Sequence, residues 1–384
     1  MSPLKFKDVP VLRFIAFIVI PLVILILAAG APKSYITSLI VTIGMYSLLC
    51  ASLNLVNGFS GMFSMGHAAF MCIGAYMTSF FTVAPNVLAA HCPGLPNFMI
   101  HTSLPYPIAL ILGGLAAAVV SLVIAFPVVR TKGHYLSVAT LALIVIVGAV
   151  VDNEEQFTYG SRGLTGIPAQ STVWPVWIVL IVCLFIMYRL VHSAYGRGLK
   201  AMRDDPTAAQ TLGINLVSKK LSIFAFSAFF AGVGGGLYAH YLTTISSAAF
   251  SFTRSFAIVE ISIIGGMGSL SGSFLGAIFY TIVPSLLQNL ENGMVLFGTR
   301  LPQLFGLANI IMAAFIIILI IFRRQGLMGN SEIILDTYFR KSTYTALFKK
   351  GEWAKIPRYF ADIPVRISAW SASRKKLRME KKAP

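Results

Sequence analysis

Long apolar stretches alternate with short polar segments along almost the whole chain. A helix needs about 20 mainly apolar residues to cross roughly 30 Å of hydrocarbon at 1.5 Å per residue. By that measure the pattern predicts ten spans, the first from Phe14 to Ala29. The others are predicted at Tyr35–Val56, His67–Ala84, Tyr106–Val129, His134–Val151, Trp174–Val191, Leu221–Ile245, Phe256–Met267, Phe274–Leu290 and Gly306–Phe322. We therefore expect an all-α polytopic membrane protein with about ten transmembrane helices.

Two parts of this pattern are irregular. The span Phe256–Met267 has only 12 residues, too few to cross the membrane, and it runs into the glycine-rich stretch 265–272. The segment 57–66 contains three glycines and no charge, although it lies between spans. We expect one or two broken or re-entrant segments here, because non-helical backbone at membrane depth must be covered by protein or line a wet cavity.

The first apolar stretch has two interpretations. Lys5, Lys7 and Arg13 precede it, and the tripeptide 29–31 (A-G-A) resembles a signal-peptidase site, so it is either a cleaved signal peptide or a membrane span. We favour a retained span, which places the N-terminus in the cytoplasm.

The longest polar interruption between spans is the segment 193–220. In it, Asp205 suits an N-cap, Pro206 suits the first helical position, and Gly213 can adopt the left-handed conformation that closes a helix. The resulting short helix, 206–212, is marginal on its own in water. We expect it to rest on a partner surface; the alternative is an ordinary surface helix in a cytoplasmic loop.

Composition supports the membrane class and adds a charge asymmetry. Of 384 residues, 57% are hydrophobic and 11% are charged, and the mean hydropathy is +0.80. The formal net charge is +17, and residues 323–384 carry 15 of the 30 Lys and Arg against 5 acids. We expect a transmembrane domain over 1–322 and a basic cytoplasmic tail over 323–384 that faces anionic lipid rather than nucleic acid.

Basic residues also orient the spans. With a cytoplasmic N-terminus, the segments 130–133 and 192–220 fall inside together with the tail, and these three regions hold most of the Lys and Arg. The segment 85–105 has neither Lys nor Arg and falls outside. So does 152–173, which carries three acids and one arginine.

The sequence has no motif for catalysis or cofactor binding. It contains no phosphate-binding G-x-x-x-x-G-K-[ST] loop and no H-E-x-x-H. Its four cysteines, Cys50, Cys72, Cys92 and Cys183, lie in different segments without zinc spacing. We predict a protein that is not an enzyme, binds no metal and holds no cofactor of its own.

Two polar residues inside or beside spans have alternative roles. Glu260 is the only acid within a predicted span, and it must face a partner or a polar cavity because a carboxylate in lipid is costly. It either lines a passage or hydrogen-bonds backbone freed by the broken helix. His67 begins a span after the glycine segment, and it either contacts a substrate or is a satisfied capping or interior histidine.

Several motifs together resemble one family. The run T-A-A-Q-T-L-G, from Thr207 to Gly213, resembles the E-A-A-x-x-x-G loop by which permeases of ATP-driven (ABC) importers dock into their ATPase, with Thr207 in place of the usual Glu. Its longer context, G-R-G-L-K-A-M-R-D-D-P-T-A-A-Q-T-L-G-I-N, is most similar to branched-chain amino acid permeases of the LivM type. Further matches lie at 60–76 (S-G-M-F-S-M-G-H-A-A-F-M-C-I-G-A-Y), 130–142 (R-T-K-G-H-Y-L-S-V-A-T-L-A), 160–168 (G-S-R-G-L-T-G-I-P) and 260–272 (E-I-S-I-I-G-G-M-G-S-L-S-G).

The resemblance implies a permease subunit of the bacterial cytoplasmic (inner) membrane. Its implied partners are a homologous second permease subunit, two cytoplasmic ATPases that hold ATP and Mg, and an extracytoplasmic binding protein that delivers leucine, isoleucine or valine. The alternatives are a urea or amide permease of the same family and an ion-coupled secondary transporter. Sparse intramembrane charge argues against ion coupling.

Two sets of site residues follow. The expected ATPase-coupling residues are Gly196, Arg197, Arg203, Asp204, Asp205, Ala208, Ala209 and Gly213. The expected translocation-pathway residues are Gly61, Ser64, Gly66, His67, Glu260, Gly265 and Gly266. We expect the segments 57–66 and 265–272 to approach each other, because only protein, water or substrate can satisfy their backbone groups at membrane depth.

Overall fold

A computed structural model describes residues 35–128, 135–291, 295–296, 299–300, 306–322, 326–329 and 332. The chain divides into two units, one made of Met1–Lys33 with Glu332–Pro384 and the other of Ser34–Ser331. The account below concerns the second unit. The predicted first span, 14–29, and almost all of the predicted basic tail lie outside the described residues.

The second unit is built from helices. In chain order they are α2 (Tyr35–Asn54), the π-helical turn η2 (Leu55–Phe59), α3 (His67–Phe80), α4 (Pro85–His91), α5 (Asn97–His101), α6 (Tyr106–Val128), α7 (Tyr135–Asn153), α8 (Glu155–Thr158), the 3-10 turn η3 (Gly160–Arg162), α9 (Val173–His192), α10 (Ala194–Asp204), α11 (Pro206–Thr211), α12 (Leu216–Leu242), the 3-10 turn η4 (Ser247–Phe250), α13 (Phe252–Gly265), α14 (Leu270–Glu291) and α15 (Leu307–Phe322). Two short strands, β1 (Val295–Leu296) and β2 (Thr299–Arg300), pair antiparallel between α14 and α15.

Every predicted span from residue 35 onward corresponds to a helix, which confirms the all-α polytopic fold. In the described part of the chain, seven helical segments are long and apolar enough to cross a membrane. The helices α3 and α15 are shorter, with 14 and 16 residues. α3 ends before the predicted Ala84, because Ala84 precedes Pro85 and takes an extended conformation.

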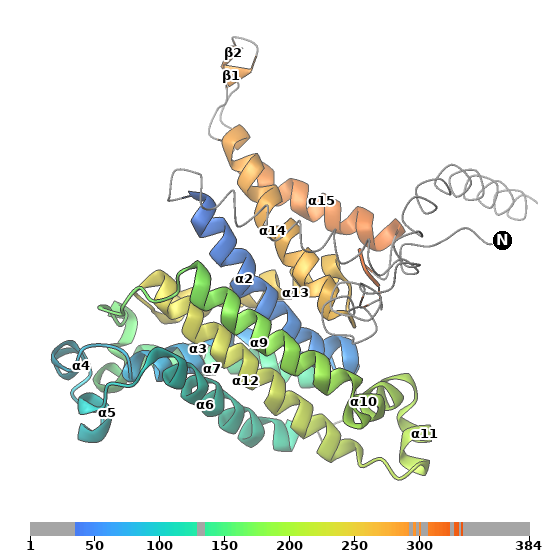
Figure 1. Cartoon of the computed structure of the whole chain (residues 1–384), viewed down its shortest axis with the longest axis horizontal. Helices are drawn as coiled ribbons and strands as arrows, with labels where there is room; N and C mark the ends of the chain where they lie inside the picture. The colour runs from blue at the N-terminus through green and yellow to red at the C-terminus, as the bar shows by residue number, and fades with distance from the viewer. Residues whose placement is uncertain are drawn as a thin grey trace, which may run out of the picture. The chain divides into compact units, whose positions relative to one another are not determined.

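Glycines hold the centre of the bundle together by letting backbones touch. α12 packs along both α3 and α6, while α2 packs against α9, α12, α13 and α14 (Figure 1). A Cβ atom at Gly74 would lie 2.2 Å from the carbonyl oxygen of Gly232, and one at Gly235 would lie 2.0 Å from that of Met71. Such contacts exclude any side chain, and Gly232 and Gly236, four residues apart on α12, serve this close packing.

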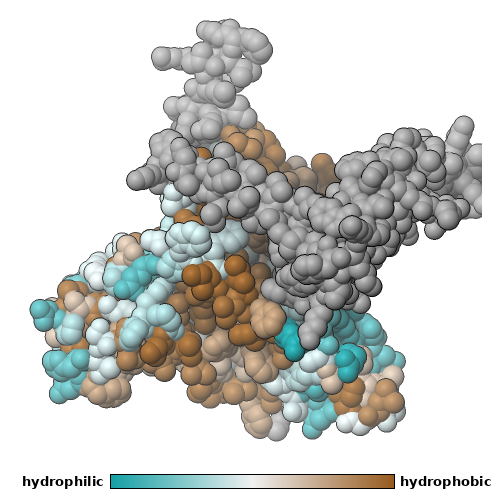
Figure 2. All heavy atoms as spheres, viewed as in Figure 1, coloured by the Kyte–Doolittle hydropathy of each residue, from teal (hydrophilic) through white to brown (hydrophobic). Residues whose placement is uncertain are grey.

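The surface of the bundle carries an apolar belt between two more polar ends. Large apolar side chains project from α6, α7 and α9, with Val123 70% exposed and Val145 72% exposed. Figure 2 shows hydrophobic atoms across the middle of the molecule and hydrophilic atoms towards both ends. The helices α4 and α5 lie at one of these ends and α10 and α11 at the other (Figure 1). This arrangement agrees with opposite sides for the predicted segments 85–105 and 192–220.

Candidate functional site

The polar loop folds as two consecutive helices, α10 and α11, beyond the end of α9. The Asp205 carboxylate accepts hydrogen bonds from the backbone N–H groups of Thr207 (2.8 Å) and Ala208 (3.1 Å), and Pro206 is the first helical residue. Gly213 has φ +79°. The predicted N-cap, proline position and left-handed closing glycine are therefore confirmed.

The loop contains more helical residues than predicted, because α10 precedes α11. Ser193 caps α10 by accepting a hydrogen bond from the Gly196 N–H, and Asn215 starts α12 by accepting one from the Ser218 N–H (3.1 Å). Ser193 and Asn215 are both residue types that favour the N-cap position, so the sequence contained a signal for these two helix starts. Burial raises the pKa of the Tyr195 hydroxyl, which pairs with Ser222 on α12 and keeps its proton at neutral pH.

α11 presents an apolar edge to solvent. Ala208 is exposed, and Leu212 at the end of α11 is 78% exposed, although both lie outside the apolar belt. Ala209 is buried against the loop itself. A leucine exposed on a helix too short to be stable alone indicates a surface that a partner covers.

The other predicted coupling residues lie on α10. Gly196 is buried, and a Cβ atom there would lie 2.1 Å from the Val191 carbonyl oxygen, whereas Arg197 is exposed. Arg203 forms a salt bridge of 3.0 Å with exposed Asp204. That pair contributes little stability at a surface, so the position of Arg203 has to be explained by its other contact.

Arg203 joins α10 to the glycine segment. Its Nη1 donates a hydrogen bond of 3.1 Å to the carbonyl oxygen of Gly58 in η2. Gly61 has φ +73°, and a Cβ atom there would lie 2.8 Å from Cγ of Arg203. Lys200, one turn earlier, places its ammonium 5.7 Å from the centre of the Phe59 ring. Two of the predicted site residues, Arg203 and Gly61, are thus in direct contact.

The glycine segment differs from the prediction at its start. Residues 57–59 belong to the π-helical turn η2, so the non-helical stretch is 60–66. Asn57 closes that stretch by donating from Nδ2 to the Ser64 carbonyl (3.1 Å) and accepting from the Ser64 N–H (2.9 Å). The turn η2 ends the helical segment Tyr35–Phe59, and π-helical turns are frequently found at functional sites.

The break between α13 and α14 packs directly on η2. A Cβ atom at Gly58 would lie 2.2 Å from the backbone nitrogen of Gly268. Asn54 bridges the two segments: Oδ1 accepts from the Gly268 N–H (2.9 Å), and Nδ2 donates to Ser269 O (3.0 Å) and Ser273 Oγ (2.9 Å). The predicted approach of segments 57–66 and 265–272 is confirmed. Asn54 was missed, although an amide within an apolar span was a usable signal.

The break itself is covered by protein. Gly266 and Gly268 have φ +114° and +97°, conformations that other residues rarely adopt. The carbonyls of Ile264 and Gly265 accept hydrogen bonds from the N–H groups of residues 327 (2.9 Å) and 328 (3.1 Å). The segment 326–329 follows α15, just past the predicted end of the transmembrane domain. Hence the broken helix is held by Asn54 on one side and by this segment on the other.

The remaining predicted pathway residues lie at the start of α3 and on α13. His67 is buried and its Nε2 pairs with Ser52 Oγ (2.8 Å), while its Nδ1 and the Ser64 hydroxyl have no partner among the described residues. A Cβ atom at Gly66 would lie 2.5 Å from the Thr140 carbonyl. Glu260 is half-buried on α13, without a hydrogen bond or salt bridge in the described part of the chain.

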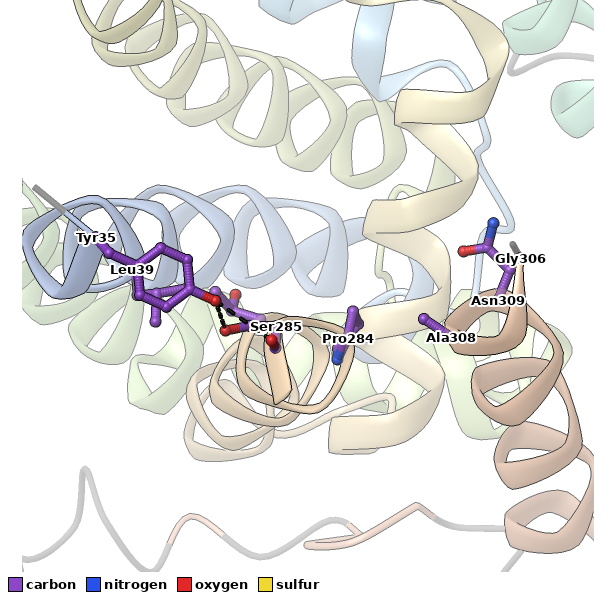
Figure 3. A pocket seen from close by; sticks show the side chains of 8 residues that line it. Tyr35, Leu39, Pro284, Ser285, Gly306, Ala308 and Asn309 are labelled. Carbon is purple, nitrogen blue, oxygen red and sulfur yellow. Dashed lines mark hydrogen bonds between the residues drawn. The ribbon is translucent and has the colours of Figure 1, made fainter. Parts of the chain in front are cut away.

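A separate recess lies away from all these residues. It has a volume of about 440 Å³ and lies between the start of α2, the part of α14 around Pro284, and the start of α15 (Figure 3). The Tyr35 hydroxyl hydrogen-bonds Ser285 across one end of it. The lining contains no charged side chain: Tyr35, Leu39, Thr281, Pro284, Ser285, Gly306, Ala308 and Asn309.

The fold and these contacts define the described part as a multi-pass α-helical membrane protein with a broken helix joined to a polar loop. Residues 35–322 match the family model described as branched-chain amino acid transport system / permease component, and the chain belongs to this family. No solved structure matches the chain.

Three similar proteins are permeases by name. The high-affinity branched-chain amino acid transport system permease protein LivM of Salmonella typhimurium is 29% identical over 288 residues, which cover 66% of this chain and 64% of that protein. The probable permease LivM of Methanocaldococcus jannaschii is 23% identical over 345 residues, which cover 80% of this chain and 96% of that protein. The probable permease LivH of the same organism is 23% identical over 277 residues, which cover 64% of this chain and 86% of that protein.

Proposed function

We propose that this chain is a membrane-spanning permease subunit of an ATP-driven importer and forms part of the translocation pathway for branched-chain amino acids. The observation that carries the proposal is the continuous contact from α10 through Arg203 and Gly58 to the break at Gly268. A movement of the polar loop is thereby transmitted to the broken helix without passing through lipid-facing helices.

The partners follow from the same reading. The chain pairs with a homologous second permease subunit, and its relationship to both LivM and LivH proteins supports a pathway built from two related chains. ATP and Mg are bound by two cytoplasmic ATPases, because the sequence has no phosphate-binding loop. A binding protein on the outer side of the bacterial inner membrane supplies leucine, isoleucine or valine.

The ATPase contact is assigned to α10 and α11. Exposed Leu212 and Ala208 supply an apolar edge, while Arg197, Asp204 and Asp205 supply charge around it. An apolar knob within a charged rim is typical of a specific protein interface. Pathway roles are assigned to Gly61, Ser64, Gly66, His67, Glu260, Gly265 and Gly266, which lie in or beside the segments that meet at the break.

Reconstituted transport tests the function. Proteoliposomes are prepared with the chain, its second permease subunit and the ATPases. They should accumulate radiolabelled leucine only when ATP is on the side of the membrane that carries the ATPases and the binding protein is on the opposite side. A protonophore should leave uptake unchanged. Uptake that requires a proton gradient and no ATP would identify an ion-coupled carrier, and uptake of urea but not leucine would identify the other permease type.

The coupling role is tested at Gly213. A Cβ atom there meets nothing within 4 Å, so Gly213→Val adds strain at φ +79° without a steric clash. We expect normal insertion and ATP hydrolysis, but leucine uptake reduced about tenfold or more, since the helix end presented to the ATPase is displaced. Gly198→Ala is the matched control, because a Cβ atom there makes only an ordinary 3.5 Å contact with Lys219. Equal uptake by Gly213→Val and Gly198→Ala would remove α11 from coupling.

A further inference from the structure

Arg254 is a cation placed between helices without an acidic partner. It lies in the first turn of α13 and is half-buried. Among the described residues it forms no salt bridge. A positive charge in the first turn opposes the helix dipole, so helix stability does not account for it. An unpaired charge at membrane depth is expensive and usually marks a functional position.

The contacts of Arg254 make a cradle rich in hydrogen-bond donors, with one guanidinium and two tyrosine hydroxyls. Its Nη1 donates to the Tyr46 hydroxyl on α2, and its Nη2 donates to the Tyr238 hydroxyl on α12 (2.6 Å). The guanidinium also lies 4.9 Å from the centre of the Tyr238 ring. Each phenol oxygen accepts from Arg254 and keeps its own O–H proton to donate. Of the five guanidinium N–H groups, three have no partner in the described part of the protein.

A cradle with a guanidinium and two O–H donors favours a ligand with several acceptor sites and a negative charge. A carboxylate has two oxygens with about four acceptor sites and no donor, and it pairs with a guanidinium in a bidentate manner. The N-terminus of α13 adds a favourable dipole for an anion at the same place. An amide carbonyl would offer these donors one uncharged oxygen, and a protonated amine would offer none.

The surroundings fit a short aliphatic chain. The recess beside Arg254 is bounded by four helices, and its other walls are Thr42, Met45, Tyr46, Leu49, Met71 and Tyr238. As the helices stand, it has room for about one water molecule. Flexible methionines on α2 and α3 allow the walls to repack around a ligand of variable shape. The larger recess near Tyr35 has no charged side chain and cannot pair with an anion in this way.

The recess adjoins the irregular segment. Ser255, the residue after Arg254, donates a hydrogen bond from its hydroxyl to the Met65 carbonyl. Met65 precedes Gly66 and His67, which begin α3. Parting of α13 from α2 would therefore open the recess next to the segment that packs on the break.

We infer that Arg254, Tyr46 and Tyr238 form a binding site for the carboxylate of a small aliphatic acid, closed in the present arrangement and opened when α13 separates from α2. This inference deepens the proposed transport function and rests on it for the identity of the acid as an amino acid in transit.

Ligand binding to the assembled importer without its binding protein tests this site. Binding of radiolabelled leucine in nanodiscs would be competed by 4-methylpentanoate, which keeps the carboxylate and the branched chain. It would not be competed by 3-methylbutylamine, which lacks the carboxylate. Arg254→Gln should weaken leucine and 4-methylpentanoate binding by about tenfold to a hundredfold, the range for hydrogen bonds to a charged group. Arg254→Lys should retain part of the affinity, because the charge stays and the fork is lost.

Matched variants separate binding from a structural role. Arg162→Gln is the control, because exposed Arg162 also lies over a tyrosine ring, at 5.7 Å from the centre of Tyr159, but lines neither of the two recesses described above. Tyr46→Phe and Tyr238→Phe each remove one O–H donor with little change in shape. Each should weaken the binding of leucine and 4-methylpentanoate several-fold. They keep the test valid if Arg254→Gln does not assemble.

Three results would overturn the inference. Unchanged acid binding in Arg254→Gln, or in both phenylalanine variants, would leave the cluster as a structural bracket. Equal competition by the amine would show that the carboxylate is not recognised. Stabilisation by phosphatidylglycerol that disappears in Arg254→Gln, without competition by the acids, would assign the site to a lipid phosphate. If leucine uptake fails in the wild type but 4-methylpentanoate still binds through Arg254, only the proposed function is wrong.

Discussion

Two glycine-rich regions of this bundle use the same residue for opposite purposes. Where α12 crosses α3 and α6, glycines lie within regular helices, and their backbones touch in pairs such as Gly74 with Gly232. At the junction of η2 with the α13–α14 break, glycines lie outside regular α-helix, and Gly58 touches Gly268. The first contact is between regular α-helices. The second is between segments where the regular α-helical hydrogen-bond pattern is interrupted.

The difference lies in what satisfies the backbone. In the α3–α6–α12 crossing, the backbones pack directly on one another, with side-chain bonds such as Thr78 Oγ1 to the Ala109 carbonyl beside them, so the contact has one stable arrangement set by packing. At the junction, Asn54 and Asn57 replace helical hydrogen bonds with side-chain bonds. Side-chain bonds can be exchanged for other partners at modest cost, since their net contribution is only about 1 kcal/mol each. We expect the crossing to be rigid and the junction to change during transport.

The largest effect is expected from filling the crossing. In Gly235→Val the new side chain begins 2.0 Å from the Met71 carbonyl, and neither backbone can move without separating α3 from α12. We expect destabilisation of more than about 3 kcal/mol, and little folded protein in the membrane. Gly148→Val on α7 is the control, because nothing lies within 4 Å of a Cβ atom there. The measurement is the yield of monodisperse protein and its thermal unfolding in detergent.

If Gly235→Val folds as well as Gly148→Val, the crossing is not the rigid element. The same measurement on the assembled importer would then show whether a partner subunit supplies the missing stability.

Removing the polar bridge at the junction should have the next largest effect. Asn54→Ala leaves the Gly268 N–H and the Ser269 carbonyl without their side-chain partner, at a cost of about 2–3 kcal/mol. We expect a folded protein with a lower unfolding temperature and uncoupled ATP hydrolysis, because the break is no longer fixed to η2. Asn153→Ala is the control, since its amide bonds only the Ala149 carbonyl at the surface. Normal leucine uptake by Asn54→Ala would disprove the role of the bridge.

The sequence predicted the two regions to different depths. Apolar periodicity, the G-x-x-x-G spacing on α12 and the short span before Gly265 were sufficient for the helices, the close crossing and the break. They could not identify the partners of the break, because Asn54 lies 212 or more residues away in sequence from the groups it bonds at the break. Nor did they single out Arg254, which lies just before the predicted span and has meaning only beside Tyr46 and Tyr238.

A smaller and more specific effect is expected at Glu260. It lies six residues after Arg254, about 9 Å further along the axis of α13 at 1.5 Å per residue, so the two side chains leave the helix at different levels. If Glu260 meets the ammonium group at a later position, Glu260→Gln should lower the maximal rate of leucine uptake about tenfold. Its assembly and thermal stability should match the wild type.

Comparison with Glu260→Ala separates the two roles of this residue. Failure of both variants to assemble would favour a structural role, and unimpaired uptake by both would remove Glu260 from the mechanism. Loss of uptake in both with normal assembly is the outcome expected for a pathway residue.

The smallest expected effect is on the reactivity of a buried thiol, Cys92, which depends on pH. Cys92 lies after α4, in the same buried cluster as Met71 and Leu88, and burial raises the pKa of its thiol from 9.0 to about 11. Since the raised pKa favours the protonated form in the folded state, the associated stability is complete below pH 9 and is lost as the pH rises towards 11. Alkylation of Cys92 at pH 8 should therefore be slow in the wild type, because only the thiolate reacts.

This rate distinguishes the two regions when it is measured in their variants. Asn54→Ala loosens the junction and should leave Cys92 protected at pH 8, whereas any Gly235→Val protein that reaches the membrane should be alkylated several-fold faster. Mass spectrometry of the peptide containing Cys92 after timed exposure to iodoacetamide gives both rates, and the buried thiol of Cys183 on α9 serves as an internal reference. Equal acceleration in the two variants would mean that the crossing and the junction open together, because the buried cluster around Cys92 joins Met71 and Ala239 of the crossing to Leu53 beside Asn54.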